Sequence, residues 1–515
     1  MWSSTNFSDF GAFQRQSDEF ASWLASRNGV RVNNKIRIAD LRANAAGRGV
    51  GTFLRLHEFS LVSAVCRWQF KSNLLAVIVA QADIIEGEEL FTIPRALVLS
   101  THNSNLQSRL SQNLGELGPW LSLMLVMIYE YLQRDNSTWA PYFRVLPHNF
   151  DTLMFWSPEE LAELQGSAVV EKIGREGAEA SILETIIPIV RAHPQVFPPI
   201  DGLASFEGDM GAQVLLNLAH IMGSLIMAYA FDVEKPENED ERDGEDGYLT
   251  DDEDEQTSKG MVPLADILNA DADRNNARLF QEEESLVMKA IKPIHAGEEI
   301  FNDYGEIPRA DLLRRYGYVT DNYTPYDVVE LSLDLFCSCA GLSNSDIESQ
   351  PRLQFLENLE LLDDGYAIPR PSADESLLDI IPEELAVLLK TLTLTPEQFT
   401  HQEQKQKPPK LTFGKDEARV LLDTVVKSQQ RYNTTIQEDH ELLAQINQLE
   451  ASSPLGGSSR RRKMAVQVRL GEKEILEFLK LKLSEHIASA ETNPSSKRTA
   501  NGDVDDSRRT KAQKN

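Results

Sequence analysis

Three residues near the middle of the chain could hold a ligand and orient an amine. Asn269 ends the segment MVPLADILN, Tyr304 lies within Asn-Asp-Tyr-Gly, and Tyr316 lies within Arg-Arg-Tyr-Gly-Tyr. An amide and two phenols on separate segments suit a site that grips a polar cofactor and guides a cationic substrate. Each segment alone is more often structural, because short motifs commonly mark turns. Their order and spacing, with a Gly-Arg-Gly segment upstream, favour a functional site.

The composition predicts a globular protein with a sizeable core. A chain of 515 residues with 41% hydrophobic residues suggests two or three domains. It contains no run of 18 apolar residues, so we expect no transmembrane helix. The first residues do not show the pattern of a secretory signal. Three cysteines argue against a disulfide scaffold and for a reducing compartment.

The charge is strongly negative and unevenly spread. The net charge is −29, and residues 234–256 carry 13 acidic and 2 basic residues. Such a run cannot bury apolar surface, so we expect a disordered loop, as a solvated insertion rather than a docking arm. An acidic protein is a poor general binder of nucleic acid, because phosphate contacts need cationic surface. A basic protein partner fits this charge better.

Periodicity predicts strands near the N-terminus and helices after them. The strand-like segments are 35–50, 75–80 and 89–93, preceded by an amphipathic helix at 8–29. Residues 101–231 are mostly helical by period, with Pro119 suited to a first helical position. A capping box begins at Ser157, and 211–231 predicts a buried helix. His220 in that helix is more often a core residue than a metal ligand.

The C-terminal third predicts a separate helical domain and a polar tail. Helical periods occupy 377–392, 416–432 and 436–450, and 464–487 predicts a short strand followed by a helix. The tail from residue 491 is polar and disordered in character. The tail contains two basic pairs, Lys497-Arg498 and Arg508-Arg509, and an Arg-Arg-Arg-Lys run lies upstream at 460–463. These basic residues suit a bipartite nuclear import signal and a solubilising tail equally well.

Several segments in order give the chain a family resemblance. They are GRG (47–49), EGEELFTIPRALVLS (86–100), WAPYFRVLP (139–147), MFWSPEELAELQGS (154–167), MVPLADILNA (261–270), NDYG (302–305) and LLRRYGYV (312–319). Over roughly residues 15–490 the chain resembles the SET-domain protein-lysine methyltransferases related to the plant Rubisco large-subunit methyltransferase. A lone G-x-G is weak evidence of a ligand loop, but its place before EGEELFTIPR strengthens that interpretation.

The resemblance implies an α+β fold. In it, a SET-domain β-fold is interrupted by a helical insertion and followed by an all-α-rich C-terminal substrate-binding domain. The implied segments are 15–100 for the first part of the SET domain, 101–233 for the insertion, 234–258 for the acidic loop, 259–320 for the second part of the SET domain, 321–490 for the substrate-binding domain and 491–515 for the tail.

The resemblance also implies roles for single residues. Tyr304 matches the catalytic tyrosine beside the methyl-transfer channel. S-adenosylmethionine, with no metal, is the implied co-substrate, and the residues implied to bind it are Gly47, Arg48, Gly49, Tyr229, Asn269, Ala270 and Tyr316. The residues implied to contact the substrate lysine are Trp120, Asp266, Tyr304 and Tyr316. For Asp266, a structural hydrogen bond is an equally good interpretation.

Three features depart from the family pattern. Many SET domains have histidine after the asparagine, where this chain has Ala270, so that only the backbone can serve there; we interpret the alanine as a mark of the fungal ribosomal branch. Cys337 and Cys339 are too few for tetrahedral zinc and are interpreted as free thiols. Residues 51–74 interrupt the segment after the glycines, and we hypothesise that they come from a retained intron.

The function implied is transfer of a methyl group to a lysine of a ribosomal protein of the large subunit. Lysine attacks as the neutral amine, so alignment and desolvation in an aromatic channel do most of the work. The alternatives are a histone or transcription-factor lysine methyltransferase, and a non-enzymatic, degenerate SET scaffold that binds basic proteins. We expect a monomer with a basic protein substrate, without direct nucleic-acid or membrane binding, in the nucleus and also, as a second location, in the cytoplasm.

Overall fold

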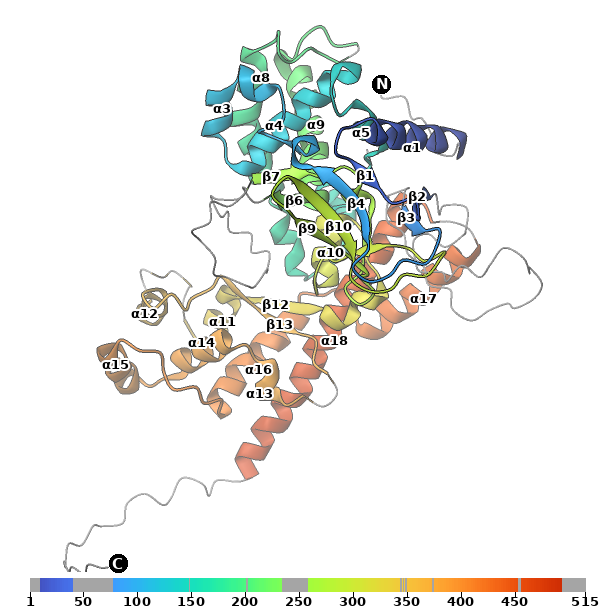
Figure 1. Ribbon diagram of the computed structural model, residues 1–515. Coiled ribbons are helices and arrows are strands. Elements are labelled where there is room, and N and C mark those ends of the chain that lie inside the picture. Colours follow the sequence, from blue (N-terminus) through green and yellow to red (C-terminus); the bar gives the residue numbers. More distant parts are fainter. Residues whose placement is uncertain are drawn as a thin grey trace, which may run out of the picture. The chain divides into compact units, whose positions relative to one another are not determined.

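The computed structural model describes most of the chain, in two compact units (Figure 1). The described residues are 10–39, 77–147, 149–200, 202–233, 258–342, 345, 347, 350–372, 375–452 and 455–492. The first unit comprises residues 1–164, 169–327 and 441–468, and the second comprises 165–168, 328–440 and 469–515. The Gly-Arg-Gly segment, residues 51–74, the acidic run 234–256 and the basic pairs of the tail lie outside the described residues.

An antiparallel sheet of four strands is the largest sheet among the described residues. Its order is β1 (Arg31–Val32), β4 (Glu89–Pro94), β10 (Ser285–Ala290) and β9 (Ala277–Gln281). The central strand β4 buries four consecutive residues, so both of its faces are covered. A register shift between Met288 and Lys289 interrupts the pairing of β10 with β4. The expected strand at 89–93 is thereby confirmed.

Three smaller sheets account for the other strands in the described part of the first unit. β2 (Ile36–Ala39) pairs with β3 (Val77–Ala80), and β5 (Leu99–Ser100), β7 (Ser258–Met261) and β6 (Ala230–Val233) form a three-stranded sheet. β8 (Asn269–Ala270) and β11 (Phe301–Asn302) pair in parallel. This last pair brings together two segments that lie about thirty residues apart in the sequence.

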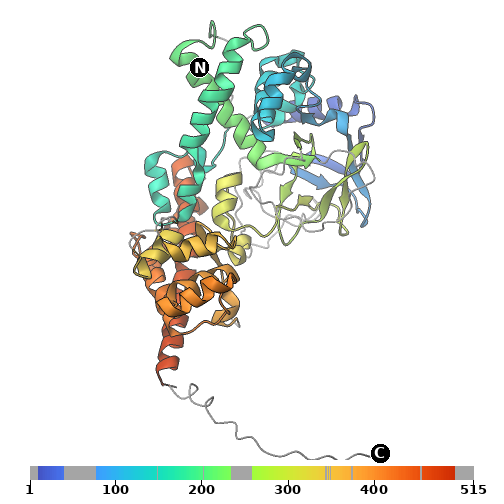
Figure 2. The same ribbon diagram turned by 90° about the vertical axis from the view of Figure 1, so that its left-hand side faces the viewer.

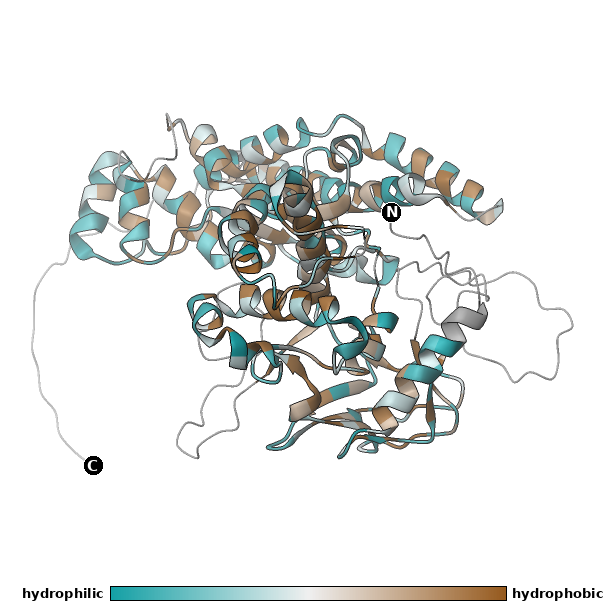
Figure 3. Ribbon diagram, turned by 90° about the horizontal axis from the view of Figure 1, so that it is seen from above, coloured by the Kyte–Doolittle hydropathy of each residue, from teal (hydrophilic) through white to brown (hydrophobic). Residues whose placement is uncertain are grey.

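Helices of the first unit gather beside these strands, as Figures 1 and 2 show from two directions. They are α1 (Phe10–Ala25), α2 (Leu106–Arg109), α3 (Ser111–Glu116), α4 (Pro119–Leu132), α5 (Ala140–Val145), α6 (Pro158–Leu161), α7 (Arg175–Ser181), α8 (Ile187–Ala192), α9 (Gly208–Tyr229) and α10 (Arg309–Tyr316). Pro119 begins α4 and Ser157 caps α6 in a capping box, both as the sequence predicts. Many helices are apolar along one side and polar along the other (Figure 3).

Helix α9 is the central apolar helix of the first unit. By length and composition it is, among the described residues, the one helix that could cross a membrane. Its residues Leu215, Leu218 and Met222 are buried in the large core of this unit. A helix of the protein core passes the same test, and the buried residues of α9 place it in the core of this unit. The buried helix expected at 211–231 is confirmed.

The start and the end of α10 are both fixed by close contacts. Arg309 donates from its Nε to Asp327 at 3.0 and 3.1 Å, and both side chains are buried. At the other end, Gly317 has φ +74°, and a Cβ there would lie 2.7 Å from the backbone nitrogen of Thr152. Only glycine accepts both the left-handed backbone and this approach. Helix α10 is therefore held at a defined position against residues 151–152.

The basic run at residues 460–463 is part of the folded first unit. Arg461 donates to Asp151 at 3.1 Å and to Glu160 at 2.7 Å, and Arg460 donates to Asp151 at 2.6 Å. The next two residues also pair with carboxylates, Arg462 with Glu163 and Lys463 with Glu450. These cations therefore stabilise the fold, whereas the basic pairs of the tail remain candidates for an import signal.

The second unit is built from helices around a two-stranded sheet. β12 (Val328–Ser332) and β13 (Gly365–Pro369) pair antiparallel. The helices are α11 (Leu333–Cys339), α12 (Pro351–Glu357), α13 (Leu377–Ile380), α14 (Glu383–Thr393), α15 (Pro396–Lys405) and α16 (Lys415–Gln429), with parts of α17 (Ile436–Ser452) and α18 (Gly457–Thr492). Cys337 and Cys339 in α11 are free thiols, as expected.

Two expectations for the C-terminal third need correction. Residues 464–487 were expected to begin with a strand, but they lie wholly within the 36-residue helix α18. The alternating apolar pattern is buried on several sides of that helix, which explains why a period of two was misleading. The expected helix at 377–392 is divided at Pro382, which lacks the backbone N–H that a continuous helix would use.

The ion pair at the start of α10 makes a prediction about stability. Changing Asp327 to Asn leaves the buried Arg309 cation with only the exposed carboxylate of Asp321, 3.7 Å away, so we expect the free energy of unfolding to fall by about 3 kcal/mol. Denaturant unfolding measures this loss. The control is Asp416→Asn, whose exposed side chain lies 4.0 Å from Arg419 and should change stability by less than about 0.5 kcal/mol. Equal stability of the two variants would contradict the prediction.

Candidate active site

Two of the predicted site tyrosines stack on each other. The rings of Tyr304 and Tyr316 lie 4.1 Å apart between centroids, with an angle of 7° between their planes. Tyr304 follows β11 in a turn where Gly305 has φ +78° and donates to Asp303 at 2.8 Å. Tyr316 is the last residue of α10. The structure thus brings together two residues that the sequence assigned to one site from their order alone.

The environment keeps the hydroxyl groups of both tyrosines protonated. Burial raises the pKa of Tyr304 well above its usual value, and the neighbouring Tyr316, Tyr318, Tyr229 and Tyr323 raise it further. Burial also raises the pKa of Tyr316 to about 12. Neutral phenols can accept a hydrogen bond from an amine without stabilising its charged form as a phenolate would. The tyrosine cluster therefore suits the binding of a neutral amine.

Tyr229 joins this cluster from the helical insertion. It is the last residue of α9, and Ala230 continues in an extended conformation into β6. Tyr229 interacts electrostatically with Tyr304 and with Tyr142. The pKa of Tyr142 is raised mainly by burial, then by Asp266, and to a smaller extent by Tyr229. The placement brings Tyr229 near the predicted catalytic tyrosine. Its assigned contact with a cofactor stays a prediction.

Asp266 lies in the interior, bonded to a tyrosine that the sequence analysis did not single out. The hydroxyl of Tyr142 donates to Asp266, and both side chains are buried. Burial raises the pKa of Asp266 to about 7, and the bond from Tyr142 lowers it in part. This hydrogen bond is the structural role that was one of the two interpretations of Asp266. A contact with substrate stays a prediction.

Asn269 is placed by a short parallel pairing and oriented by a carboxylate. In the register of β8 with β11, Asn269 lies opposite Phe301. Its Nδ2 donates to Oε1 of Glu299 at 2.5 Å. Because a carboxylate only accepts, this bond turns the amide oxygen of Asn269 away from Glu299. The amide oxygen is then available to a ligand, which fits the expected cofactor role.

The position after Asn269 shows how the chain manages without a histidine. Ala270 is buried, and the next residue, Asp271, donates its backbone N–H to Asn302 at 3.1 Å. The carboxylate of Asp271 accepts from Arg274 at 2.9 Å and from Asn322 at 3.1 Å. These bonds tie the end of β8 to β11 and to the residues that follow α10. Side-chain contacts of Asp271 thus support the loop after the alanine.

The roles of two further assigned groups of residues stay predictions. Trp120, near the start of α4, is half-buried and packs on the large core of the first unit. Gly47, Arg48 and Gly49 lie outside the described residues. Their roles in binding lysine and cofactor stay predictions. Glu299 and Tyr142 were given no role from the sequence, although the Glu-Glu pair before β11 contains the first and the segment WAPYFRVLP (139–147) contains the second.

The comparisons agree with the fold. Residues 75–305 match the SET domain family, and residues 343–476 match the Rubisco LSMT substrate-binding family. The solved structure of Rubisco LSMT bound to AdoMet aligns with a TM-score of 0.64 at 20% identity, covering 93% of each chain. That likeness shows the fold.

Curated relatives identify the family. Ribosomal lysine N-methyltransferase 4 of Saccharomyces cerevisiae is 34% identical over 62% of this chain, and the match spans 59% of the yeast protein. N-lysine methyltransferase SETD6 of Bos taurus is 31% identical over 78% of this chain and 87% of its own. The chain therefore belongs to the SET-domain protein-lysine methyltransferases, whose co-substrate is S-adenosylmethionine.

Proposed function

We propose that this chain methylates a lysine of a ribosomal protein of the large subunit. The observation that carries the proposal is the similarity to a yeast protein named as a ribosomal lysine methyltransferase. The net charge of −29 supports it, because an acidic enzyme attracts a basic protein substrate. The basic pairs of the tail are compatible with import into the nucleus, where we place the modification.

The tyrosine pair supports methyl transfer through position and desolvation. The rings of Tyr304 and Tyr316 exclude water from the amine of the substrate lysine where it faces the cofactor. This desolvation lowers the pKa of the lysine, so that more of it is in the neutral form. The hydroxyl of Tyr304 accepts an N–H of that amine and so directs its lone pair. S-adenosylmethionine, when bound, supplies an electrophilic methyl on a sulfonium, a cation that aromatic faces and the Asn269 oxygen can accommodate.

Removal of the Tyr304 hydroxyl should slow catalysis selectively. For Tyr304→Phe we expect kcat to fall about 30-fold, equal to about 2 kcal/mol, because the amine loses the acceptor that orients it. Affinity for S-adenosylmethionine should change less than about twofold. Single-turnover methyl transfer and calorimetric titration measure the two quantities. The control is Tyr131→Phe, which removes a hydroxyl in α4; unchanged turnover of the Tyr304 variant would refute the role of this residue.

The bond between Asn269 and Glu299 predicts a binding defect. A glutamine at position 299 can present either its oxygen or its NH2 group, so Glu299→Gln no longer fixes the orientation of Asn269. We expect the dissociation constant of S-adenosylmethionine to rise about tenfold, measured by calorimetry. Glu298→Gln is the matched control, because that neighbouring carboxylate caps the backbone of His295 instead. Equal affinity of both variants would remove Glu299 from the binding site.

The substrate class can be tested directly. The purified protein, incubated with radiolabelled S-adenosylmethionine and an extract of unmethylated ribosomes and nuclear proteins, should label one or a few proteins of the large ribosomal subunit. Mass spectrometry then locates the methylated lysine. The Tyr304→Phe variant is the control for labelling by contaminants. Labelling confined to histones or transcription factors would contradict the proposed substrate while leaving the enzyme class intact.

A further inference from the structure

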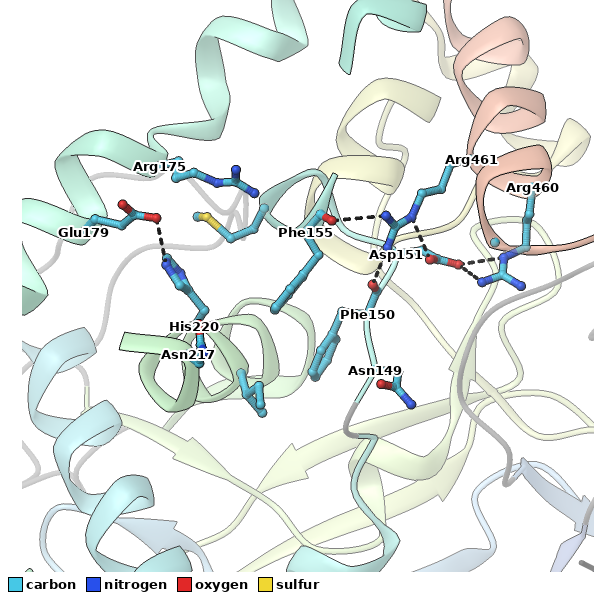
Figure 4. A pocket seen from close by; sticks show the side chains of 13 residues that line it. Asn149, Phe150, Asp151, Phe155, Arg175, Glu179, Asn217, His220, Arg460 and Arg461 are labelled. Atoms are coloured by element: carbon cyan, nitrogen blue, oxygen red, sulfur yellow. Dashed lines mark hydrogen bonds and ion pairs between the residues drawn. The ribbon is translucent and has the colours of Figure 1, made fainter. Parts of the chain in front are cut away.

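A cavity lies in the first unit, and neither of the stacked tyrosines lines it. It has a volume of about 810 Å³ and is lined by residues of η4 (Leu153–Phe155) and its approach, of α7, of α9 and of the start of α18 (Figure 4). Phe150 and Phe155 form part of its wall and stack with 5.5 Å between ring centroids. The cavity therefore combines an aromatic surface with charged groups at its margin.

Most charges around this cavity already have partners. Asp151 accepts from Arg460 and Arg461, and these bonds are drawn on one side in Figure 4. On the other side, Nε2 of His220 lies 3.2 Å from Glu179. Burial lowers the pKa of His220, so the imidazole is neutral at neutral pH. Neither pair leaves a cation available to a ligand.

Arg175 is the exception. Its guanidinium donates to the backbone oxygen of Trp156 at 3.4 Å, a long bond, and no carboxylate of the described residues forms an ion pair with it. Figure 4 shows its side chain extending over the cavity toward Phe155. A guanidinium offers five N–H donors in a planar fork, so most of its donors remain for a ligand. The group that matches this fork is a carboxylate bound through both oxygens.

The cavity and the tyrosine cluster share their supporting elements. Helix α9 contributes His220 to the cavity and Tyr229 to the cluster, roughly 14 Å apart along the helix at 1.5 Å per residue. Gly317, directly after Tyr316, packs against the backbone of Asp151 and Thr152 beside η4. An extended polypeptide covers roughly 14 Å in about four residues. A peptide segment of about four residues is therefore long enough to span this distance along α9.

We propose that Arg175 binds a carboxylate side chain of the protein substrate, a few residues away from the target lysine. The inference rests on the lysine methyltransferase function but not on the ribosomal identity of the substrate. The stacked Phe150 and Phe155 cover the apolar stem of that side chain. Glu179, four residues after Arg175 on α7, opposes a polyanion more strongly than a single carboxylate. The chain has a net charge of −29 and therefore repels acidic residues in general. The cation of Arg175 offsets this repulsion locally, so that one acidic residue of a mostly basic substrate can bind there.

A lysine-centred peptide library tests this inference with the full-length protein. Each pool fixes Glu, Gln or Lys at one position, from six residues before to six residues after the target lysine, and the readout is the initial rate of methyl transfer. Wild-type protein should prefer Glu over Gln about tenfold at one position, through KM rather than kcat. Arg175→Glu should lose that preference and favour Lys at the same position. The control is Arg278→Glu, at an exposed arginine of β9, which should behave as wild type.

The outcomes separate this inference from the proposed function. A flat Glu-to-Gln ratio at all positions, an Arg175→Glu variant with unchanged preference, or a library that the wild-type protein leaves unlabelled would each overturn it. Calorimetric titration of S-adenosylmethionine shows whether the Arg175→Glu variant is folded, and Arg175→Gln, which should flatten the preference without reversing it, provides a milder variant. A clear preference at one position together with labelling of non-ribosomal proteins in extract would refute the ribosomal substrate alone.

Discussion

The short parallel pairing of strands β8 and β11, two residues on each, determines where the site forms. β8 and β11 align Asn269 with Phe301, so that the amide and the turn that carries Tyr304 start from neighbouring strands. Asn276 strengthens the same junction, because its side chain accepts from the backbone of Phe301 at 2.8 Å and donates to that of Glu299 at 3.0 Å. With so few backbone bonds, the alignment depends on side chains that bond to backbone across the gap. The tyrosine pair and the orientation of Asn269 both follow from it.

The residues of the site could be predicted from the sequence where the motif is local. Tyr304, Tyr316 and Asn269 belong to short segments whose order is characteristic, and the structure brings the first two into contact. Tyr142 of α5 bonds to Asp266, 124 residues further along the chain, and although both lie in segments that carry the family resemblance, no local pattern indicates their contact. The strand predicted at the start of 464–487 was wrong, because the helix found there is buried on several sides and its apolar residues no longer follow a helical period.

The absence of a histidine at Ala270 is compensated locally. Asp271 accepts hydrogen bonds from two side chains and two backbone N–H groups, while its own N–H donates to β11. A buried carboxylate with this many donors is strongly held in one rotamer, so the loop after β8 does not need an imidazole for its shape. Tyr323 adds to the same loop, since its hydroxyl accepts from the backbone of Ala272 at 3.1 Å. The alanine therefore changes which atoms support the site without removing the support.

Helix α18 has a consequence for how this protein can be divided. Its first residues belong to the first unit, where Arg460 and Arg461 bind Asp151, and the rest belongs to the second. A fragment that ends after residue 327 would keep the buried Asp151 carboxylate and lose both of its arginines, which is costly. The catalytic half is therefore not a contiguous piece of the chain. A single genetic crossover between residues 328 and 440 would therefore exchange the last segment of the first unit together with part of the second.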